Sequence, residues 1–595
     1  MISNQSWYRA LTAFSGLLVA TLILTAAYAF DRYQDRRDQP SEIAAQHRRS
    51  PDEESPLSFQ LLDESKSAGV SGMSLQEQET DDQSSYYGEA LRRLKGAAVA
   101  VADVNSDGRP DILVTYSLFK DESANRLFIN QGGGRFEDRT EKSGLAGLHG
   151  RGLFLDLTNS GRRDLVLLEK CPAVYRNDGR GVFTRDESVD LGCHCAIFGA
   201  NVLDINEDGY IDLLLSPYAA KCNESPNNRA QATNGGLPIF FESQKGLTFK
   251  RVERPGLPTR SGWTHAIGVA DIDYSGQSDI WFATDYGSDR IFLNDGKQSY
   301  IDVTSENTDH TYQGNGMSAE MADIDNDGRP VVFVSHVFQR YYNVEGNALW
   351  KWRAGHRFSE ISTERGVNRC GFAWGAKFAD VDNDGWQDLV VGNGFRSASP
   401  NRNYYFANGT VDSGAQYMLR QSRMWPSMRD VSWSGYQSPC LFMNQGGKFV
   451  DMAKFTDFSH NFSSDNRGVA TIDVENDGRL GFIFSNQSQP AELYRNRPVG
   501  SAARPAWIGF ELIGSQTNRD AIGAKVEVRL SDGRVLRREV QPFNGYMAQS
   551  DGRVHFGLGV APKIESIVVR WPAPQFGVQQ VPTFELSSYN KVVEQ

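Results

Sequence analysis

The sequence has little cysteine, no excess of basic residues and none of the common catalytic signatures. Six Cys among 595 residues are too few to form the scaffold of so long a chain. A formal net charge of −12 argues against nucleic acid as a partner, because phosphate binding needs clustered Lys and Arg. We find no Gly-x-Ser-x-Gly elbow, Walker loop, His-Glu-x-x-His or dinucleotide glycine fingerprint. The sequence therefore predicts no catalytic residues.

Apolar residues and glycine are plentiful. A hydrophobic fraction of 39%, with 11% aromatic residues, is enough to bury a core and excludes wholesale disorder. The 57 Gly residues favour many turns and short strands over long helices.

The N-terminus carries a targeting signal. Arg9 precedes an uncharged apolar run, Ala10 to Phe30, which contains Ala27-Tyr28-Ala29 near its end. Small residues at these two positions are typical of a cleavage site, so residues 1–29 are interpreted first as a signal peptide. The run is also long enough to be an uncleaved membrane anchor. Either alternative places the rest of the chain outside the cytoplasm.

Residues 30–90 form a zone that is dense in charge and poor in apolar periodicity, as in "DRYQDRRDQPSEIAAQHRRSPDEESP". Such a segment buries too little apolar surface to offset its conformational entropy. We predict a mostly disordered tether. A short helix around Leu57 to Leu75 is an alternative for part of it.

An internal repeat dominates residues 91–500. Seven times, an apolar run leads into an acidic loop and then into a second apolar run, as in "VADVNSDGRPDILV" and "FADVDNDGWQDLVV". The loops begin at Asp103, Asp156, Asp204, Asp271, Asp323, Asp380 and Asp473.

A second phrase, an aromatic–apolar–Asn turn such as "RLFINQGGGRF", recurs between the copies. Asn and Gly accept positive φ cheaply, so these turns read as hairpins, and one period holds about four strands. Four strands are one propeller blade, and the pattern predicts an all-β fold with a seven-bladed β-propeller. The long interval between Asp380 and Asp473 holds an aromatic-rich insertion at about 398–430, which we predict to contact a partner.

The acidic loops have the chemistry of a cation site. In Asp-x-Asp-x-Asp-Gly-x-x-Asp, oxygen side chains stand at positions one, three, five and nine, and Gly at position six makes the sharp turn. Hard oxygen ligands on a flexible loop favour calcium over magnesium. A set of Asx-type turns without metal is the alternative.

The copies differ in their predicted ligands. Three sets are complete: Asp103, Asn105, Asp107 and Asp111; Asp204, Asn206, Asp208 and Asp212; Asp380, Asp382, Asp384 and Asp388. A fourth set, Asp271, Asp273 and Asp279, has Ser275 at position five, which weakens it. Two sets lack the ninth carboxylate: Asp323, Asp325 and Asp327, and Asp473, Glu475 and Asp477. The loop from Asp156 has two carboxylates and is predicted to be a metal-free turn.

On these motifs the chain resembles a known family. The strand–loop–strand units resemble the FG-GAP/VCBS repeats that form β-propellers in integrin α-chain heads. "NRDAIGAKVEVRLSDGRVLRREV", "GYMAQSDGRVHFGLG" and "IESIVVRWPAP" resemble the ASPIC/UnbV domain. The combination is similar to the cartilage acidic protein family, without the EGF-like module of the animal protein. The resemblance implies an extracellular calcium-binding propeller followed by a small β domain, with no established catalytic residues.

Residues 501–595 also read as a β domain from their pattern alone. "AKVEVRL-SDG-RVLRREV" alternates apolar and polar residues around a turn, which is a hairpin pattern. His555 lies beside Phe556 between turn glycines, so a packed strand histidine is favoured over a catalytic base.

The cysteines allow two interpretations. Cys193, His194 and Cys195 form a cluster that could hold copper or zinc. Disulfide pairing in an oxidising compartment is the favoured alternative, with Cys370–Cys440 as one plausible pair.

Two functions follow from these features. The first is an extracytoplasmic calcium-binding module that recognises a protein or glycan. The second is an extracytoplasmic enzyme, or a metal-dependent biosynthetic accessory protein, that uses the propeller channel. The missing catalytic set favours the first.

Overall fold

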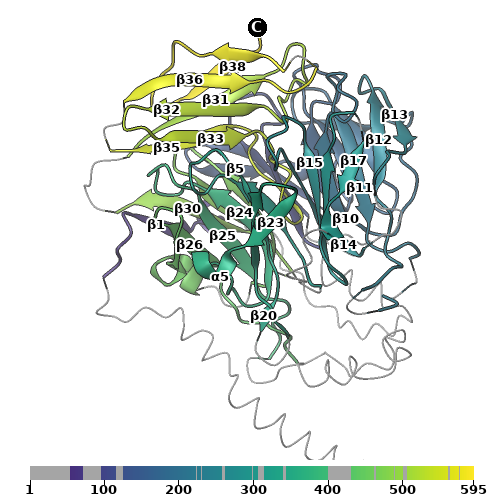
Figure 1. Cartoon of the computed structure of the whole chain (residues 1–595), viewed down its shortest axis with the longest axis horizontal. Coiled ribbons are helices and arrows are strands. Elements are labelled where there is room, and N and C mark those ends of the chain that lie inside the picture. Colours follow the sequence, from purple (N-terminus) through teal and green to yellow (C-terminus); the bar gives the residue numbers. More distant parts are fainter. Residues whose placement is uncertain are drawn as a thin grey trace, which may run out of the picture.

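Short antiparallel strands make up nearly all of the regular structure (Figure 1). The computed structural model describes residues 54–70, 96–115, 125–257, 262–305, 314–339, 343–399, 431–499 and 505–595, apart from gaps of one to three residues inside these ranges. The helices of the described residues have only three or four residues: α3 (Ser65–Ala68), α5 (Ser362–Arg365), η1 (Thr140–Lys142), η4 (Ala453–Phe455) and η5 (Asp457–His460).

The repeat region forms seven antiparallel sheets of four repeat strands, which we number repeat sheets 1 to 7 in chain order. Sheet 1 holds β2 (Ala98–Ala102), β3 (Asp111–Thr115), β4 (Arg126–Gly132) and β5 (Arg135–Asp138). Sheet 2 holds β6 (Arg151–Leu155), β7 (Asp164–Leu168), β8 (Ala173–Asn177) and β9 (Phe183–Arg185). Sheet 3 holds β10 (Ile197–Leu203), β11 (Asp212–Pro217), β12 (Ile239–Gln244) and β13 (Thr248–Val252). Sheet 4 holds β14 (Thr264–Ala270), β15 (Asp279–Thr284), β16 (Arg290–Asn294) and β17 (Tyr300–Asp302).

The remaining three sheets follow the same order of strands. Sheet 5 holds β18 (Ala319–Ala322), β19 (Val331–Val334), β22 (Ala348–Arg353) and β23 (Arg357–Glu360), with a small hairpin of β20 (Phe338–Gln339) and β21 (Asn343–Val344) beside it. Sheet 6 holds β24 (Ala373–Ala379), β25 (Asp388–Asn393), β26 (Cys440–Asn444) and β27 (Phe449–Asp451). Sheet 7 holds β28 (Asn466–Ile472), β29 (Gly481–Asn486), β30 (Glu492–Pro498) and β1 (Phe59–Asp63).

The strand β1 shows that part of the predicted tether is ordered. It pairs antiparallel with β30, and Phe59 and Leu61 are buried. The short helix α3 follows it. The physical reason is that the sequence of the seventh repeat ends after its third strand, so the N-terminal segment supplies the fourth. Residues 30–53 and 71–90 lie outside the described residues, so for them the tether stays a prediction.

The first and second strands of the repeats are almost entirely buried, with the partly exposed β18 as the main exception. All five residues of β2 and of β6 are buried, whereas β13, an outer strand, is mostly exposed. Strands with neighbours on both faces read as continuous apolar runs and not as alternating patterns. This burial explains the apolar runs that flank each acidic loop.

Neighbouring sheets are joined by side-chain hydrogen bonds. The third-strand Asn130 and Asn177 donate to carbonyls in the loop of the preceding sheet, Val474 at 3.0 Å and Val104 at 2.8 Å. Since Val474 belongs to sheet 7 and Asn130 to sheet 1, the last sheet is bonded to the first. The strands β28 and β2 also lie against each other.

The C-terminal region forms two further sheets that lie as a layer over the repeat sheets (yellow in Figure 1). One consists of β31 (Ala506–Ile513), β35 (Val554–Gly559) and β38 (Tyr589–Val593). The other consists of β32 (Lys525–Leu530), β33 (Val535–Glu539), β36 (Ile564–Arg570) and β37 (Val578–Gln580). One apolar core runs from sheets 2 and 3 into this layer, so the two regions share buried surface.

One loop of the C-terminal region, residues 541–551, enters the repeat region; we call it the axial segment. It includes β34 (Ala548–Gln549), which pairs in parallel with β2. Its hydrogen bonds reach the first strand of every repeat sheet, at Val99, Phe154, Asn201, Val269, Ala319, Lys377 and Thr471. The repeat sheets are therefore built around a piece of the C-terminal region.

Two predicted segments lie outside the described residues: the signal peptide or anchor at 1–29, and most of the insertion at 398–430. Among the residues that the structure describes, no helix has both the length and the apolar character needed to span a membrane.

Candidate metal centres

Each acidic loop connects the first and second strands of its repeat sheet, and all seven loops share one backbone conformation. The residue at position four has a positive φ in every copy: Ser106, Asn159, Glu207, Tyr274, Asn326, Asn383 and Asn476. The Gly at position six also has a positive φ in every copy. Gly adopts this conformation without strain, which is why it recurs at the sharp turn.

The carboxylate at position one closes the loop. Asp103 accepts hydrogen bonds from the N–H groups of Asp107 at 3.1 Å and Gly108 at 2.8 Å. The same pair of bonds recurs at Asp156, Asp204, Asp323 and Asp473. These carboxylates thus form Asx-type turns, whether or not a cation is present.

The carboxylate at position nine has a structural partner that the sequence did not indicate. Asp111 is fully buried and accepts from the N–H of Val104 at 3.0 Å and of Asn130 at 2.8 Å. Asp212, Asp279 and Asp388 accept from the equivalent pairs of N–H groups. The ninth residue therefore ties the loop to the third strand.

Two loops gather three carboxylates closely enough for one cation. The ligating oxygens of Asp271, Asp273 and Asp279, and those of Asp380, Asp382 and Asp384, each lie within 4.8 Å of one another. We call these the Asp271 loop and the Asp380 loop. They are the groups of this kind among the described residues. The Asp271 loop is one that the sequence marked as weakened by Ser275.

The Asp380 loop gathers three carboxyl groups without a direct ion pair. Asp380 is fully buried, and its Oδ1 has no hydrogen-bond partner in the described structure. Burial first, and then the neighbouring Asp384 and Asp382, hold the pKa of Asp380 well above its usual range. No Lys or Arg of the described residues lies within 4.0 Å of these three carboxylates. A divalent cation relieves such a cluster, and oxygen-rich ligands suit calcium.

In the first and third loops, which the sequence marked as complete, the predicted ligands are bonded to one another or to a basic side chain. Asn105 donates from Nδ2 to Asp107 at 3.1 Å, and Arg109 pairs with Asp107 at 2.6 Å. In the third loop, Asn206 donates to Asp208 at 3.1 Å. Their residues can turn toward a cation only by giving up these bonds.

The fifth and seventh loops, which lack the ninth carboxylate, carry cations of the protein itself. The Lys351 ammonium contacts both Asp325 and Asp327. Arg495 pairs with Glu475 at 2.7 Å, and Arg479 pairs with Asp477. Lys351 and Arg495 come from later strands, β22 and β30, so the loop sequence alone did not show them, whereas Arg479 lies in the loop itself.

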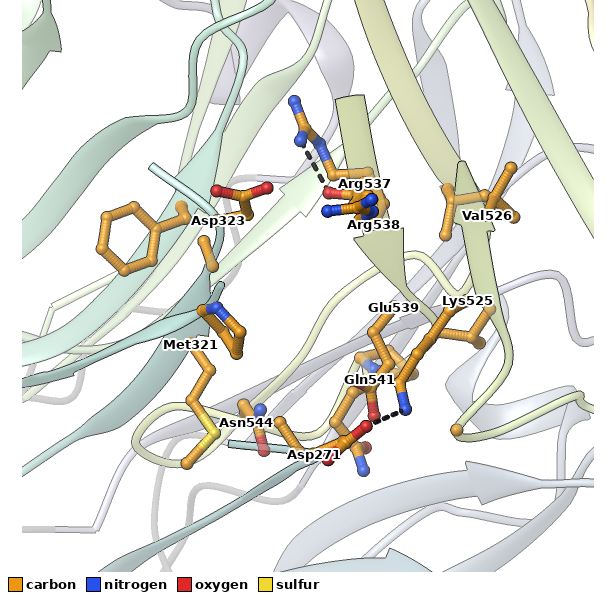
Figure 2. A pocket seen from close by; sticks show the side chains of 18 of the residues that line it. Asp271, Met321, Asp323, Lys525, Val526, Arg537, Arg538, Glu539, Gln541 and Asn544 are labelled. Carbon is orange, nitrogen blue, oxygen red and sulfur yellow. Dashed lines mark hydrogen bonds and ion pairs between the residues drawn. The ribbon is translucent and has the colours of Figure 1, made fainter. Parts of the chain in front are cut away.

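The C-terminal region contacts the loops directly. Lys525 Nζ lies 2.6 Å from Asp271 Oδ2, the N–H of Gly557 donates to Asp380 Oδ2 at 3.0 Å, and the Tyr589 hydroxyl donates to Asp473 at 3.0 Å. A cavity of about 600 Å³ lies between the two regions. Figure 2 shows Asp323 and Met321 on its repeat side, facing Lys525 and Glu539 of the C-terminal strands.

The histidine and cysteine predictions are resolved by their contacts. His555 is buried and stacks on Trp507, and burial lowers its pKa to about 3, so it is the packed strand histidine that the sequence favours.

The cysteines form three disulfides, Cys171–Cys193, Cys195–Cys222 and Cys370–Cys440, as the favoured alternative predicts. The copper or zinc cluster at 193–195 is wrong, because both thiols are consumed. Three disulfides indicate an oxidising, extracytoplasmic compartment.

Known families match both regions. The family described as ASPIC and UnbV matches residues 514–594, and the FG-GAP-like repeat matches residues 103–167 and 271–334. Cartilage acidic protein 1 of Xenopus tropicalis is 24% identical over 85% of this chain and 66% of its own length. The Mus musculus protein of that name is 23% identical over 55% of this chain.

An integrin is also related. Integrin alpha-IIb of Mus musculus is 26% identical over 34% of this chain and 16% of its own length. The chain spans 66% of the frog relative and 44% of the mouse cartilage protein. The chain thus consists of FG-GAP-like repeats followed by a C-terminal ASPIC and UnbV domain, and it is a distant relative of cartilage acidic protein 1 and of integrin α chains.

Proposed function

We propose that the protein is an extracytoplasmic, calcium-binding β-propeller of seven blades that acts as a binding module for a protein or glycan. The observation that carries the proposal is the Asp380 loop, a carboxylate cluster with a buried, unpartnered oxygen, in a repeat of the same pattern as those that the FG-GAP-like repeat model matches. Ring closure is supported by two hydrogen bonds that link sheet 7 to sheet 1, from Asn130 to Val474 and from Asn476 to Gly108.

The axial segment argues against the alternative function, an enzyme that uses the central channel. In a closed ring, the first strands of the blades line the channel. Here those strands are hydrogen-bonded to the chain itself, for example Val269 to Asn544 at 2.8 Å and Phe154 to Gln549 at 2.8 Å. This occupation favours binding on the outer surfaces over catalysis in the channel.

Calcium is expected to stabilise the protein, because an ion that binds only the folded state adds stability by mass action. The gain is about 2.7 kcal/mol per site at a concentration of about one hundred times Kd. We expect the Asp382→Ala, Asp384→Ala double variant to lose part of the rise in melting temperature that calcium gives to the wild type. The measurement is thermal unfolding, with and without calcium, together with metal analysis of the purified protein.

The matched control is Asp302→Ala, which removes an exposed carboxylate of β17 outside the loops. It is expected to keep the full calcium response. Equal melting curves with calcium and in excess chelator, for a wild type that carries no calcium, would refute the calcium function.

The insertion at 398–430 is proposed as the partner-binding element, because its Tyr, Trp and Arg residues are types that dominate interface energies. Its two ends are held together: Arg396 and Trp433 exchange backbone hydrogen bonds at 2.9 Å, and the Cys370–Cys440 disulfide lies nearby in sequence. A chain that leaves and returns at one point can be cut and rejoined with little strain.

We therefore expect that replacing residues 400–430 by a short Gly-Ser turn leaves a folded, calcium-binding protein that no longer captures its partner. Pull-down of partners by the wild type and by the deletion variant tests this, with melting temperature as the control for folding. Unchanged capture, or loss of folding, would show that the insertion is structural.

A further inference from the structure

The cavity between the repeat region and the C-terminal domain holds an ion pair that joins the two. Lys525 of β32 places its ammonium 2.6 Å from Asp271 Oδ2, and Figure 2 marks this contact. Burial lowers the pKa of Lys525, but Glu539 and Asp271 together raise it by more, so the ammonium is charged. Lys525 is paired across the strands with Glu539.

The Asp271 loop has more carboxyl groups than this one ammonium contacts. Asp273 and Asp279 place their oxygens within 4.8 Å of Asp271, and Asp279 is fully buried. The Oδ1 of Asp271 is buried and has no hydrogen-bond partner in the described structure. The ammonium contacts one of the three carboxyl groups, so the loop keeps further oxygens that a cation can take as ligands.

The Asp271 loop differs from two other loops in the origin of the basic side chain that contacts it. The Asp380 loop has a similar cluster but no ammonium or guanidinium within 4.0 Å among the described residues. The fifth loop has its cation from the same sheet, since Lys351 belongs to β22. In the Asp271 loop alone among these three, the cation in contact comes from the C-terminal domain.

We propose that Lys525 is a built-in cation of the Asp271 loop which a divalent cation displaces, so that calcium binding here and the Lys525 contact exclude each other. The proposal rests on the proposed calcium function of the loops. Coupling of this kind is reciprocal: the Lys525 contact weakens calcium binding at this loop, and calcium weakens the hold of the C-terminal domain on it. The Asp380 loop, without such a competitor, fills at lower calcium.

Replacing the competing ammonium should tighten one calcium site. Isothermal titration of the full chain is expected to show about tenfold tighter binding at the weaker site in Lys525→Met than in the wild type, the factor that corresponds to ~1.4 kcal/mol. Lys525→Arg keeps the charge and should behave like the wild type. Arg529→Met removes an exposed charge from the same strand and should change nothing. Asp271→Asn should abolish the tightened site, which assigns it to this loop.

A second measurement follows the ammonium itself. Acylation of lysines, read by peptide mass spectrometry, should label Lys525 faster in saturating calcium than in metal-free buffer, while the exposed Lys563 is labelled equally in both. Equal calcium affinity in wild type and Lys525→Met, or labelling of Lys525 that ignores calcium, would overturn the competition. Absence of calcium binding from every variant would instead overturn the proposed function.

Discussion

Tyr546→Ala is expected to lower the free energy of unfolding of the whole chain by about 3–5 kcal/mol, the usual cost of removing a large buried aromatic side chain. Tyr546 lies in the axial segment and is fully buried. Its ring centroid is 5.3 Å from that of Trp374 in sheet 6 and 5.7 Å from that of His265 in sheet 4. Truncation leaves a cavity where several repeat sheets meet, so the loss should reach beyond the C-terminal domain.

Urea unfolding followed by tryptophan fluorescence and by circular dichroism measures this effect. We expect both signals to shift together to lower urea, because the axial segment belongs to one cooperative unit with the repeats. Val560→Ala, at a site that is 77% exposed in the same domain, is the control and should leave the midpoint unchanged. A repeat region that unfolds at its wild-type midpoint in Tyr546→Ala would show that the axial segment is dispensable.

In metal-free buffer the protein is expected to be more stable at pH 5 than at pH 8, and saturating calcium should remove most of this difference. Burial raises the pKa of Asp204 from its ordinary 3.8 to about 7, and burial with Asp384 raises that of Asp382 to about 6. A carboxyl with a raised pKa binds its proton more tightly in the folded state. These two carboxyls therefore cost stability as the pH rises from about 4 to about 7, and Asp212, whose pKa burial raises to about 8, extends the fall to about that pH.

The effect is large because several loops contribute. A rise of the Asp204 pKa to about 7 corresponds to at most ~4 kcal/mol, reduced by its partial contact with solvent. Urea unfolding at a series of pH values gives the slope of the free energy of unfolding against pH. Asp204→Asn should flatten this slope, whereas Asp302→Asn, at an exposed position, should not. A stability that rises with pH across this window in the absence of metal would contradict the assignment of these carboxyls.

The strands and loops could be predicted because their signals are local. An apolar run, an acidic loop and a Gly at position six specify a hairpin within about fifteen residues of sequence, and the structure has one at each copy. Of the loops that the sequence marks as complete, the Asp380 loop gathers three carboxylates within 4.8 Å of one another, as does the Asp271 loop with its Ser275. In the first and third loops the residue at position three is an Asn, Asn105 or Asn206.

What could not be predicted depends on pairings between distant residues. The strand β1 is a short segment in a charged zone, and only its pairing with β30, more than 400 positions later, makes it a strand. The basic side chains that pair with loop carboxylates, such as Lys351 and Arg495, lie outside the loop motifs in the sequence. The axial segment reads as an ordinary loop, and its role depends on seven strands that precede it.

The position of β1 and of the axial segment has a consequence for the order in which the chain can fold. The last repeat sheet needs residues near position 60, and the first strands of all the repeats need residues near position 545. A growing chain therefore cannot complete its repeat region until the residues near position 545 have been made. Assembly from the N-terminus one domain at a time, which is common in long chains, is closed to this protein. A chain whose repeats stay incomplete until the residues near position 545 have been made is well suited to crossing a membrane before it folds.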